Sequence, residues 1–352
     1  MKLFRIFLLL TALALAQDEL PTAPSATKQP PPPPAPPPAS KPETQPAAAS
    51  KEPRSTTTGA PSASASEARS EGPALETIRK RVDEVNVVFT VTDKHKRFVK
   101  NLSEVDFKVL DDGRPPQALV HFRRQTDLPL RVALLVDASS SIRERFKFEQ
   151  EASIEFFSQI IRPKYDKAMV VGFDSNVEVT QDFTDRTELL DKGLRMLRPG
   201  GGTALYDAIY RACLERLMKT DPGVTVRRAI VVLSDGDDNQ SRVTREEAIE
   251  MALRAEVVVY AISTNVTSSA RPGDKVLERI AEATGGRVFF PFKIEDVANY
   301  FSEIQDELRS QYAIAYKPTA FAFDGRFRTI DISTLDKKFK VRSRKGYYAP
   351  AQ

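Results

Sequence analysis

Three short segments carry oxygen-bearing side chains whose types and spacing could hold a metal ion. The first reads DASSS from Asp137 onward, the second reads GGGT and ends at Thr203, and the third reads LSDG, with Asp235 as its carboxylate. Carboxylate and hydroxyl oxygens are the ligands that hard divalent cations prefer. The sequence therefore predicts a cation site formed by Asp137, Ser139, Ser141, Thr203 and Asp235.

Each segment taken alone has a simpler interpretation. A serine cluster after a strand commonly forms a loop in which one serine, here Ser141, caps the next helix. The glycines before Thr203 allow tight backbone geometry, and a threonine at that place can cap a helix as well. The presence of all three segments in one chain favours the cation site.

The elements that must position these segments alternate between apolar runs of strand length and amphipathic stretches of helix length. This alternation predicts an α/β domain with a doubly wound, mostly parallel six-stranded sheet. One strand follows its predecessor too closely for a crossover, so we expect it to form an antiparallel edge hairpin. The expected strands are 130–136, 168–173, 177–181, 229–233, 257–262 and 287–290, and the expected helices are 142–161, 186–197, 204–219, 244–254, 274–284 and 294–310.

Ligands of open α/β sheets bind beyond the carboxyl ends of the strands. Asp137 ends the first expected strand and Asp235 follows the fourth, and these two strands are neighbours in such a sheet. We therefore expect both carboxylates to approach the same cavity.

Period-two alternation of apolar residues predicts further strands on both sides of this domain. The pattern is clear at Val85, Val87 and Phe89, and it returns at Tyr312 and Ile314. About seven short strands are available, and neither flank has enough of them to bury an apolar face alone. We expect one small all-β sandwich into which the α/β domain is inserted.

The three motifs resemble the metal-ion-dependent adhesion site of the von Willebrand factor type A domain, in order and in expected secondary structure. The resemblance covers roughly 128–310, and all five ligand positions of the family are filled. The flanking β segments, with DFKVLDDG from Asp106 and RKGYY from Arg344, resemble an exported bacterial subgroup of this family.

The resemblance implies a role for each site residue. Ser139 and Ser141 would bind Mg²⁺ directly, and Thr203 would bind it directly in the ligand-bound state. Asp137 and Asp235 would act largely through bridging waters. Mn²⁺ and Ca²⁺ are the alternative ions. One open coordination position would accept an Asp or Glu carboxylate of a protein partner.

The start of the chain is typical of an export signal. Lys2 and Arg5 precede the uncharged run IFLLLTALALA, which is shorter than the roughly 20 residues needed to span a bilayer. A stretch rich in Pro, Ala and Ser follows, without Phe, Tyr, Trp, Val or Ile, and it predicts a disordered spacer. The expected organisation is a signal peptide at 1–16, a linker at 17–75, β-module segments at 76–127 and 311–352, and a von Willebrand factor type A domain at 128–310.

Composition excludes several classes of function. The only cysteine, Cys213, rules out an internal disulfide framework and cysteine-clustered metal sites. The two histidines, His95 and His121, lie outside 128–310, which disfavours a hydrolase that uses a histidine base. With 52 basic and 48 acidic residues, the chain lacks the large excess of positive charge that is typical of nucleic-acid-binding proteins.

We therefore expect a non-enzymatic protein-binding module that acts in adhesion or at the cell envelope. It would be exported to the periplasm, the cell surface or the medium, and it has no further stretch long and apolar enough to span a membrane. The alternative is a structural or assembly factor of the envelope, in which the β module is the working surface and the metal site is stabilising or vestigial. Helix 294–310 leads almost directly into the strand at Tyr312, so it is either a fixed strut or a switch between the two modules.

Overall fold

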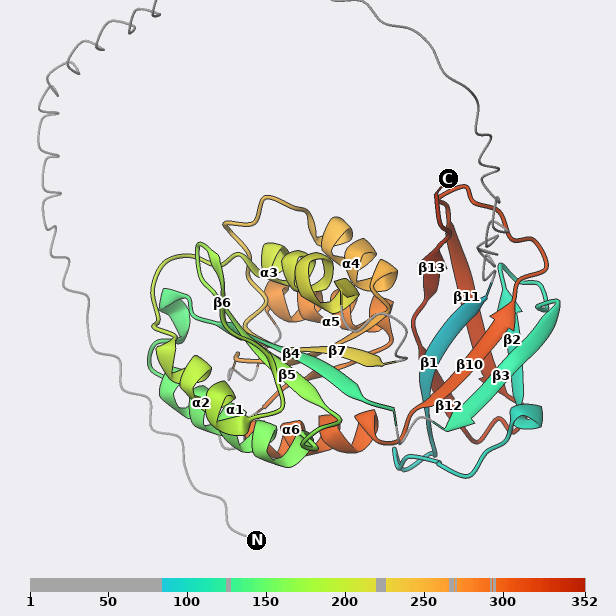
Figure 1. The fold of residues 1–352 in the computed structure, drawn as a ribbon, viewed down its shortest axis with the longest axis horizontal. Coiled ribbons are helices and arrows are strands. Elements are labelled where there is room, and N and C mark those ends of the chain that lie inside the picture. The colour runs from blue at the N-terminus through green and yellow to red at the C-terminus, as the bar shows by residue number, and fades with distance from the viewer. Residues whose placement is uncertain are drawn as a thin grey trace, which may run out of the picture. The chain divides into compact units, whose positions relative to one another are not determined.

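The structure is a computed structural model that describes residues 84–124, 128–219, 226–265, 269, 271–291, 293 and 296–351. Figure 1 shows an α/β domain and a smaller β-sandwich. The predicted signal peptide and linker lie outside the described residues. Within the described part of the chain, no helix has the length and apolar character needed to cross a membrane.

The α/β domain is built on a six-stranded sheet with the order β6-β5-β4-β7-β8-β9 (Figure 1). All pairs are parallel except that of β6 with β5, which confirms the predicted edge hairpin. Every residue of the central strand β4 is buried, as a strand covered on both faces requires. The strands are β4 (Leu130–Asp137), β5 (Lys167–Phe173), β6 (Val177–Thr184), β7 (Arg227–Ser234), β8 (Val257–Ser263) and β9 (Val288–Phe289).

Helices cover both faces of this sheet. Alternate side chains of a strand point to opposite faces, so Val132 and Leu134 of β4 belong to the hydrophobic cluster shared with α1, α2 and α6. Ala133 and Leu135 belong to the cluster shared with α3, α4 and α5. The helices are α1 (Phe146–Ile160), α2 (Thr187–Met196), α3 (Leu205–Arg211), α4 (Arg245–Arg254), α5 (Pro272–Thr284) and α6 (Asp296–Leu308).

The helix expected at 204–219 is present but is not α-helical throughout. After α3 the chain continues as a π-helical segment, Ala212–Arg216, and then as a short 3-10 turn. The buried residues Leu205, Ile209, Cys213 and Leu217 recur every four residues. In an α-helix that spacing would turn the stripe by about 40° at each step, because one turn takes about 3.6 residues. The wider π turn offsets this drift and keeps the stripe on the sheet.

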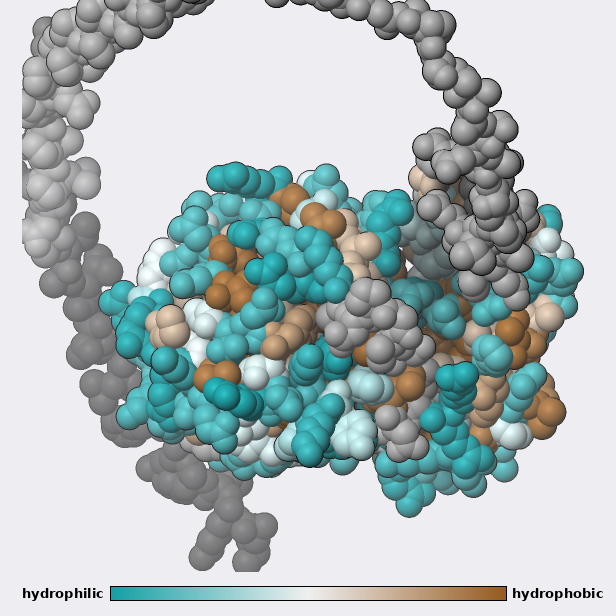
Figure 2. Space-filling model, in the orientation of Figure 1, coloured by the Kyte–Doolittle hydropathy of each residue, from teal (hydrophilic) through white to brown (hydrophobic). Residues whose placement is uncertain are grey.

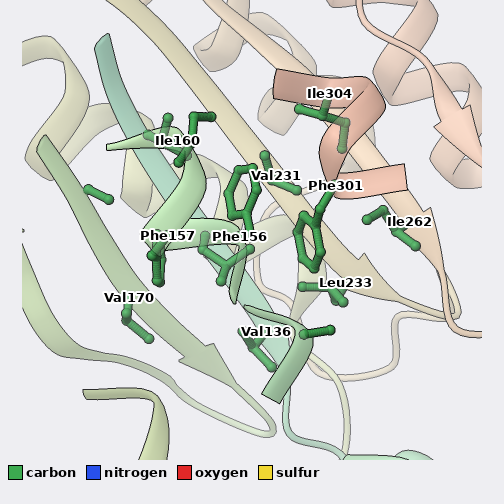
Figure 3. Packing of buried hydrophobic residues seen from close by; sticks show 14 of the residues in the cluster. Val136, Phe156, Phe157, Ile160, Val170, Val231, Leu233, Ile262, Phe301 and Ile304 are labelled. Atoms are coloured by element: carbon green, nitrogen blue, oxygen red, sulfur yellow. The ribbon is translucent and has the colours of Figure 1, made fainter. Parts of the chain in front are cut away.

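Helix α6 packs on the sheet through a stripe of apolar residues. Val297, Phe301, Ile304 and Leu308 are buried. Figure 3 shows Phe301 stacked against Phe156 of α1, with ring centroids 4.4 Å apart, above residues of the central strands. Such stacked aromatic pairs add about 1 kcal/mol beyond the area they bury.

The β-sandwich contains seven strands in two sheets, with the orders β12-β1-β10-β3 and β13-β11-β2. Both sheets combine strands that precede the α/β domain with strands that follow it, so the α/β domain is inserted and the predicted fold class is confirmed. Three of these strands come before the α/β domain and four come after it. The strands are β1 (Val85–Thr92), β2 (Phe107–Asp111), β3 (Ala118–Arg124), β10 (Tyr312–Lys317), β11 (Phe327–Thr334), β12 (Lys340–Ser343) and β13 (Gly346–Tyr348).

A buried polar joint connects α6 to the sandwich. Glu307 of α6 is fully buried, accepts a hydrogen bond of 2.8 Å from the Tyr260 hydroxyl, and lies 3.2 Å from the Arg287 guanidinium. It also forms an ion pair with Arg342 of β12. Only Glu307 is buried, and both arginines are partly exposed. A sliding helix would pull this buried carboxylate away from its partners, which costs stability, so the joint favours a fixed strut.

The surface in Figure 2 is largely hydrophilic, with small and separate hydrophobic patches. Val105 and Leu335 are the most exposed large apolar side chains among the described residues. These two residues lie close together, because the Leu335 N–H donates to the carbonyl of Asp106. Small apolar groups of this size are common on protein surfaces. By itself, the apolar surface therefore points to no particular interaction site.

Candidate metal site

The two aspartates of the predicted site lie at the ends of neighbouring parallel strands. Asp137 is the last residue of β4, and Asp235 directly follows β7. The register pairs Val136 with Leu233, so the two strands end at the same level of the sheet. Parallel pairing of β4 with β7 thus brings together two carboxylates that are 98 residues apart in sequence.

A continuous chain of contacts links four of the five predicted residues. The Ser139 main-chain N–H donates to Asp137 Oδ1 at 2.8 Å. The hydroxyls of Ser139 and Ser141 lie 2.9 Å apart, and the Ser141 hydroxyl lies 3.5 Å from Asp235 Oδ2. These residues come from the ends of β4 and β7 and from the loops that follow these strands.

The glycine-rich loop brings the fifth residue, Thr203, to the same edge. The Gly200 N–H donates to the Ala138 carbonyl at 2.7 Å, and the Ser140 hydroxyl donates to the Gly201 carbonyl at 3.1 Å. Gly201 has a φ of +70°, a conformation that favours glycine. Thr203 is buried, and its hydrogen bonds to other described residues use only its main chain. No hydrogen bond of its hydroxyl to another residue is found in the part of the chain that the structure describes.

Three residues that the motifs did not single out hold this arrangement in place. The Ser234 hydroxyl donates to Asp137 Oδ2 at 2.7 Å, so both oxygens of that carboxylate are held. Asn239 Oδ1 accepts from the Thr203 N–H at 3.0 Å, and the Ser175 hydroxyl accepts from the Gly202 N–H at 2.8 Å. Ser234 lies inside the LSDG motif and could have been noticed. The other two have no sequence signal, because their role depends on how three loops meet.

Two further acidic residues stabilise the surrounding loops through hydrogen bonds. Asp238 accepts hydrogen bonds from the Tyr206 N–H at 3.0 Å and from the Ser241 hydroxyl at 2.6 Å. Asp207 accepts from the main-chain N–H groups of Arg242 and Val243. These bonds tie the start of α3, which follows Thr203, to the loop after Asp235.

The electrostatics of the site suit a cation. Asp137 is fully buried, and burial raises its pKa to about 6, against the lowering effect of the hydrogen bonds from Ser139 and Ser234. The charge of Asp235 raises it further. A buried carboxylate held by hydroxyls and N–H groups, without a cationic side chain bonded to it, is stabilised by a positive ion.

The donor set favours a hard ion over a soft one. Within the described residues, no three His, Cys, Asp or Glu side chains are grouped so as to hold a metal. The predicted set instead offers two carboxylates and three hydroxyls, all oxygen donors. Oxygen-only sites select Mg²⁺, Mn²⁺ or Ca²⁺ over metals that prefer nitrogen or sulfur.

Comparison with known proteins gives one family match and several similar structures. The sequence profile of the von Willebrand factor type A domain matches residues 132–237. Proximal thread matrix protein 1 from the mussel byssus is similar at 19% identity and a TM-score of 0.46, over 56% of this chain and 50% of that chain. This chain thus spans about half the length of the mussel protein. No curated protein matches the chain.

Two bacterial structures are also similar. A von Willebrand factor type A protein from Catenulispora acidiphila has 12% identity and a TM-score of 0.46, over 77% of this chain and 74% of that chain. An aerotolerance-related membrane protein from Bacteroides fragilis has 16% identity and a TM-score of 0.42, over 51% and 98% of the two chains. The profile match contains all five predicted site residues. Residues 132–237 therefore belong to the von Willebrand factor type A domain family.

Proposed function

We propose that this protein is a metal-dependent protein-binding module. Asp137, Ser139, Ser141, Thr203 and Asp235 hold a divalent cation, which is Mg²⁺ in the first instance and Mn²⁺ or Ca²⁺ as alternatives. The observation that carries the proposal is the buried Asp137 carboxylate, which accepts hydrogen bonds from the Ser139 N–H and the Ser234 hydroxyl where two parallel strands end.

The donor chemistry suggests how the ion recruits a partner. With the neutral hydroxyls of Ser139 and Ser141 as its direct ligands, the ion would keep most of its positive charge. Asp137 and Asp235 would compensate part of that charge at longer range, through water. An ion held in this way would attract one more anionic oxygen, which an Asp or Glu side chain of a protein partner would supply.

The remaining parts of the proposal concern location and catalysis. We propose that residues 1–16 direct export. Residues 17–75 then form a spacer that holds the folded part of the chain away from a surface. No catalytic activity is proposed, because 128–310 contains no histidine and the site offers no separate acid–base pair. An assembly factor that works through its sandwich is the alternative.

Capture of a partner from an envelope extract distinguishes these two functions. We expect the immobilised chain to retain a partner in Mg²⁺ and to release it when EDTA removes the ion. Retention should return when Mg²⁺ is restored in excess, which controls for irreversible damage. A partner that stays bound in EDTA would support the assembly factor and contradict capture through the cation.

The raised pKa of Asp137 predicts a pH dependence of cation binding. A proton and the cation compete for this carboxylate, so protonation weakens cation binding. We expect the apparent Mg²⁺ affinity to fall as the pH drops through about 6, by about tenfold for each further unit. Calorimetric titrations at pH 5, 6 and 7 would measure the trend, and equal affinities at all three would contradict this role for Asp137.

A further inference from the structure

The connections at one end of the β-sandwich form a basic surface. The last residue of β1 pairs with the first residue of β12, and the first residue of β2 pairs with the last residue of β11. The segments that connect these strands, 93–106 and 335–339, therefore lie together at one end of the sandwich. They are in direct contact, because the Leu335 N–H donates to the Asp106 carbonyl at 2.9 Å. We call residues 93–108 and 335–340 the basic tip.

Positive charge is concentrated in the basic tip. The tip contains eight Lys or Arg residues and four Asp or Glu residues, which is an excess of four positive charges. The complete chain of 352 residues has the same excess, so the charges outside the tip balance one another. All lysines of the tip are exposed, and they are Lys94, Lys96, Lys100, Lys108, Lys337, Lys338 and Lys340.

Most of these lysines have no anionic partner in the described part of the chain. Lys338 lies 3.9 Å from Asp336, and the nearby Arg97 pairs with Asp93 at 2.8 Å. For the other six lysines, no ion pair with another described residue is found. Their charges are therefore available to an anionic partner.

Two apolar side chains lie on the same tip. Val105 is 77% exposed and Leu335 is 69% exposed, and neither belongs to the hydrophobic cluster of the sandwich. Lys108 follows Val105 by three residues, and Lys337 follows Leu335 by two. Because removal of apolar surface from water is favourable, a partner that covers both side chains gains affinity from them.

A lipid bilayer with anionic headgroups matches both features of the tip. Its surface attracts lysines, and the boundary between its headgroups and acyl chains accepts apolar side chains. Lysine stems can also lie along apolar surface while their ammonium groups stay in water. An acidic protein or a nucleic acid would pair with the lysines but leave Val105 and Leu335 in water. An apolar groove would cover these two residues but leave the lysines without partners.

We propose that the basic tip docks on membrane surfaces that contain anionic phospholipids. Val105 and Leu335 enter the headgroup region, and the lysines around them bind the phosphate groups of the lipids. Each lysine near such a surface strengthens binding about fivefold, so the attachment is peripheral and reversible. The tip contains none of the predicted metal-site residues, so this interaction goes beyond the proposed function and does not depend on it.

Sedimentation with lipid vesicles tests the proposal. The chain used is 17–352, which keeps every described residue and lacks an apolar run that would bind lipid on its own. Binding is measured in EDTA, so that no metal ion contributes. We expect the chain to bind vesicles of phosphatidylcholine mixed with phosphatidylglycerol, and to bind phosphatidylcholine alone at least about tenfold more weakly.

Two double substitutions test the two parts of the tip. Lys337→Gln with Lys338→Gln should weaken binding to the mixed vesicles about 25-fold, because each lysine contributes about fivefold. Val105→Ser with Leu335→Ser should weaken binding about tenfold, because two apolar side chains are no longer buried in the lipid. Neither change affects the hydrophobic cluster of the sandwich, so circular dichroism should show folded chains.

Matched substitutions on the α/β domain serve as controls. Lys147→Gln with Lys192→Gln removes two exposed lysines of α1 and α2. Met196→Ser with Met218→Ser removes two exposed apolar side chains. We expect both controls to bind the mixed vesicles within about twofold of the unsubstituted chain, because charges far from the membrane are screened.

Weak binding of both tip variants together with normal binding of both controls would support the proposal. Absence of binding to the mixed vesicles, or equal binding to the two kinds of vesicle, would overturn it. Equal losses in the lysine variant and its control would assign the effect to the overall charge of the chain and would overturn it as well. If only the lysine variant loses affinity, the tip is a purely electrostatic surface, an acidic macromolecule becomes the better partner, and docking on a membrane is rejected. None of these outcomes bears on the metal site, because its ion is absent throughout.

Discussion

A chain in which Asp137 and Ser139 are both replaced by alanine is expected to lose Mg²⁺ binding and to remain folded. The double change removes one of two site carboxylates and one hydroxyl that contacts Ser141. Loss of residues that merely support metal ligands lowers affinity by about 10- to 100-fold, so loss of these two should exceed about 100-fold. Calorimetry with Mg²⁺ and Mn²⁺ would measure the change.

The variant should stay folded because Asp137 is not a source of stability at neutral pH. Its pKa rises from 3.8 when unfolded to about 6 in the folded chain. The folded state therefore binds a proton more tightly, and the metal-free chain loses stability as the pH rises from about 4 to about 6. At pH 7 the buried charge costs about 3 kcal/mol, since one pKa unit corresponds to about 1.4 kcal/mol. The hydrogen bonds from Ser139 and Ser234 that the variant loses are together worth about 2 kcal/mol.

A matched control makes the same two changes elsewhere. Asp237→Ala with Ser158→Ala removes one exposed carboxylate close to the site and one exposed hydroxyl on α1. We expect this control to bind Mg²⁺ with nearly unchanged affinity. Unchanged affinity in the Asp137 and Ser139 variant, with circular dichroism showing a folded chain, would contradict the assignment of the site.

The parts of this fold that follow from local pattern could be predicted from the sequence. The apolar run from Leu130 to Val136 has the length and continuity of a strand buried on both faces, and it is one. The short link before Val177 allows only a hairpin, and the structure has one there. The proximity of Asp137 and Asp235 could be predicted as well, because adjacent parallel strands end at the same edge of a sheet.

Other features could not be predicted because they depend on three-dimensional context. Gly346–Tyr348 is too short to show alternation, and it becomes a strand only because β11 lies beside it. Asn239 and Ser175 act where loops from different strands meet. The two segments of the basic tip are far apart in the sequence, and only the strand pairing of the sandwich brings them together.

The largest structural effect is expected from removing residues 311–352. None of the three strands before the α/β domain pairs with another of them: β1 pairs with β10 and β12, β3 pairs with β10, and β2 pairs with β11. Every partner lies in the deleted segment. We therefore expect amide hydrogen exchange in 85–124 to approach the rate of an unfolded chain, because strands without partners have no protection.

The α/β domain should survive this deletion. Its two hydrophobic clusters contain no buried residue of the sandwich, and the sandwich has a cluster of its own that includes Phe89 and Tyr312. Loss of Arg342 leaves Glu307 without one cation, but Arg287 and Tyr260 remain beside it. A chain that lacks only residues 1–75 keeps all seven sandwich strands and serves as the control. If 85–124 exchanged equally slowly in the deletion variant and in this control, the first three strands would form a stable unit of their own, and a sandwich assembled from both flanks of the inserted domain would be excluded.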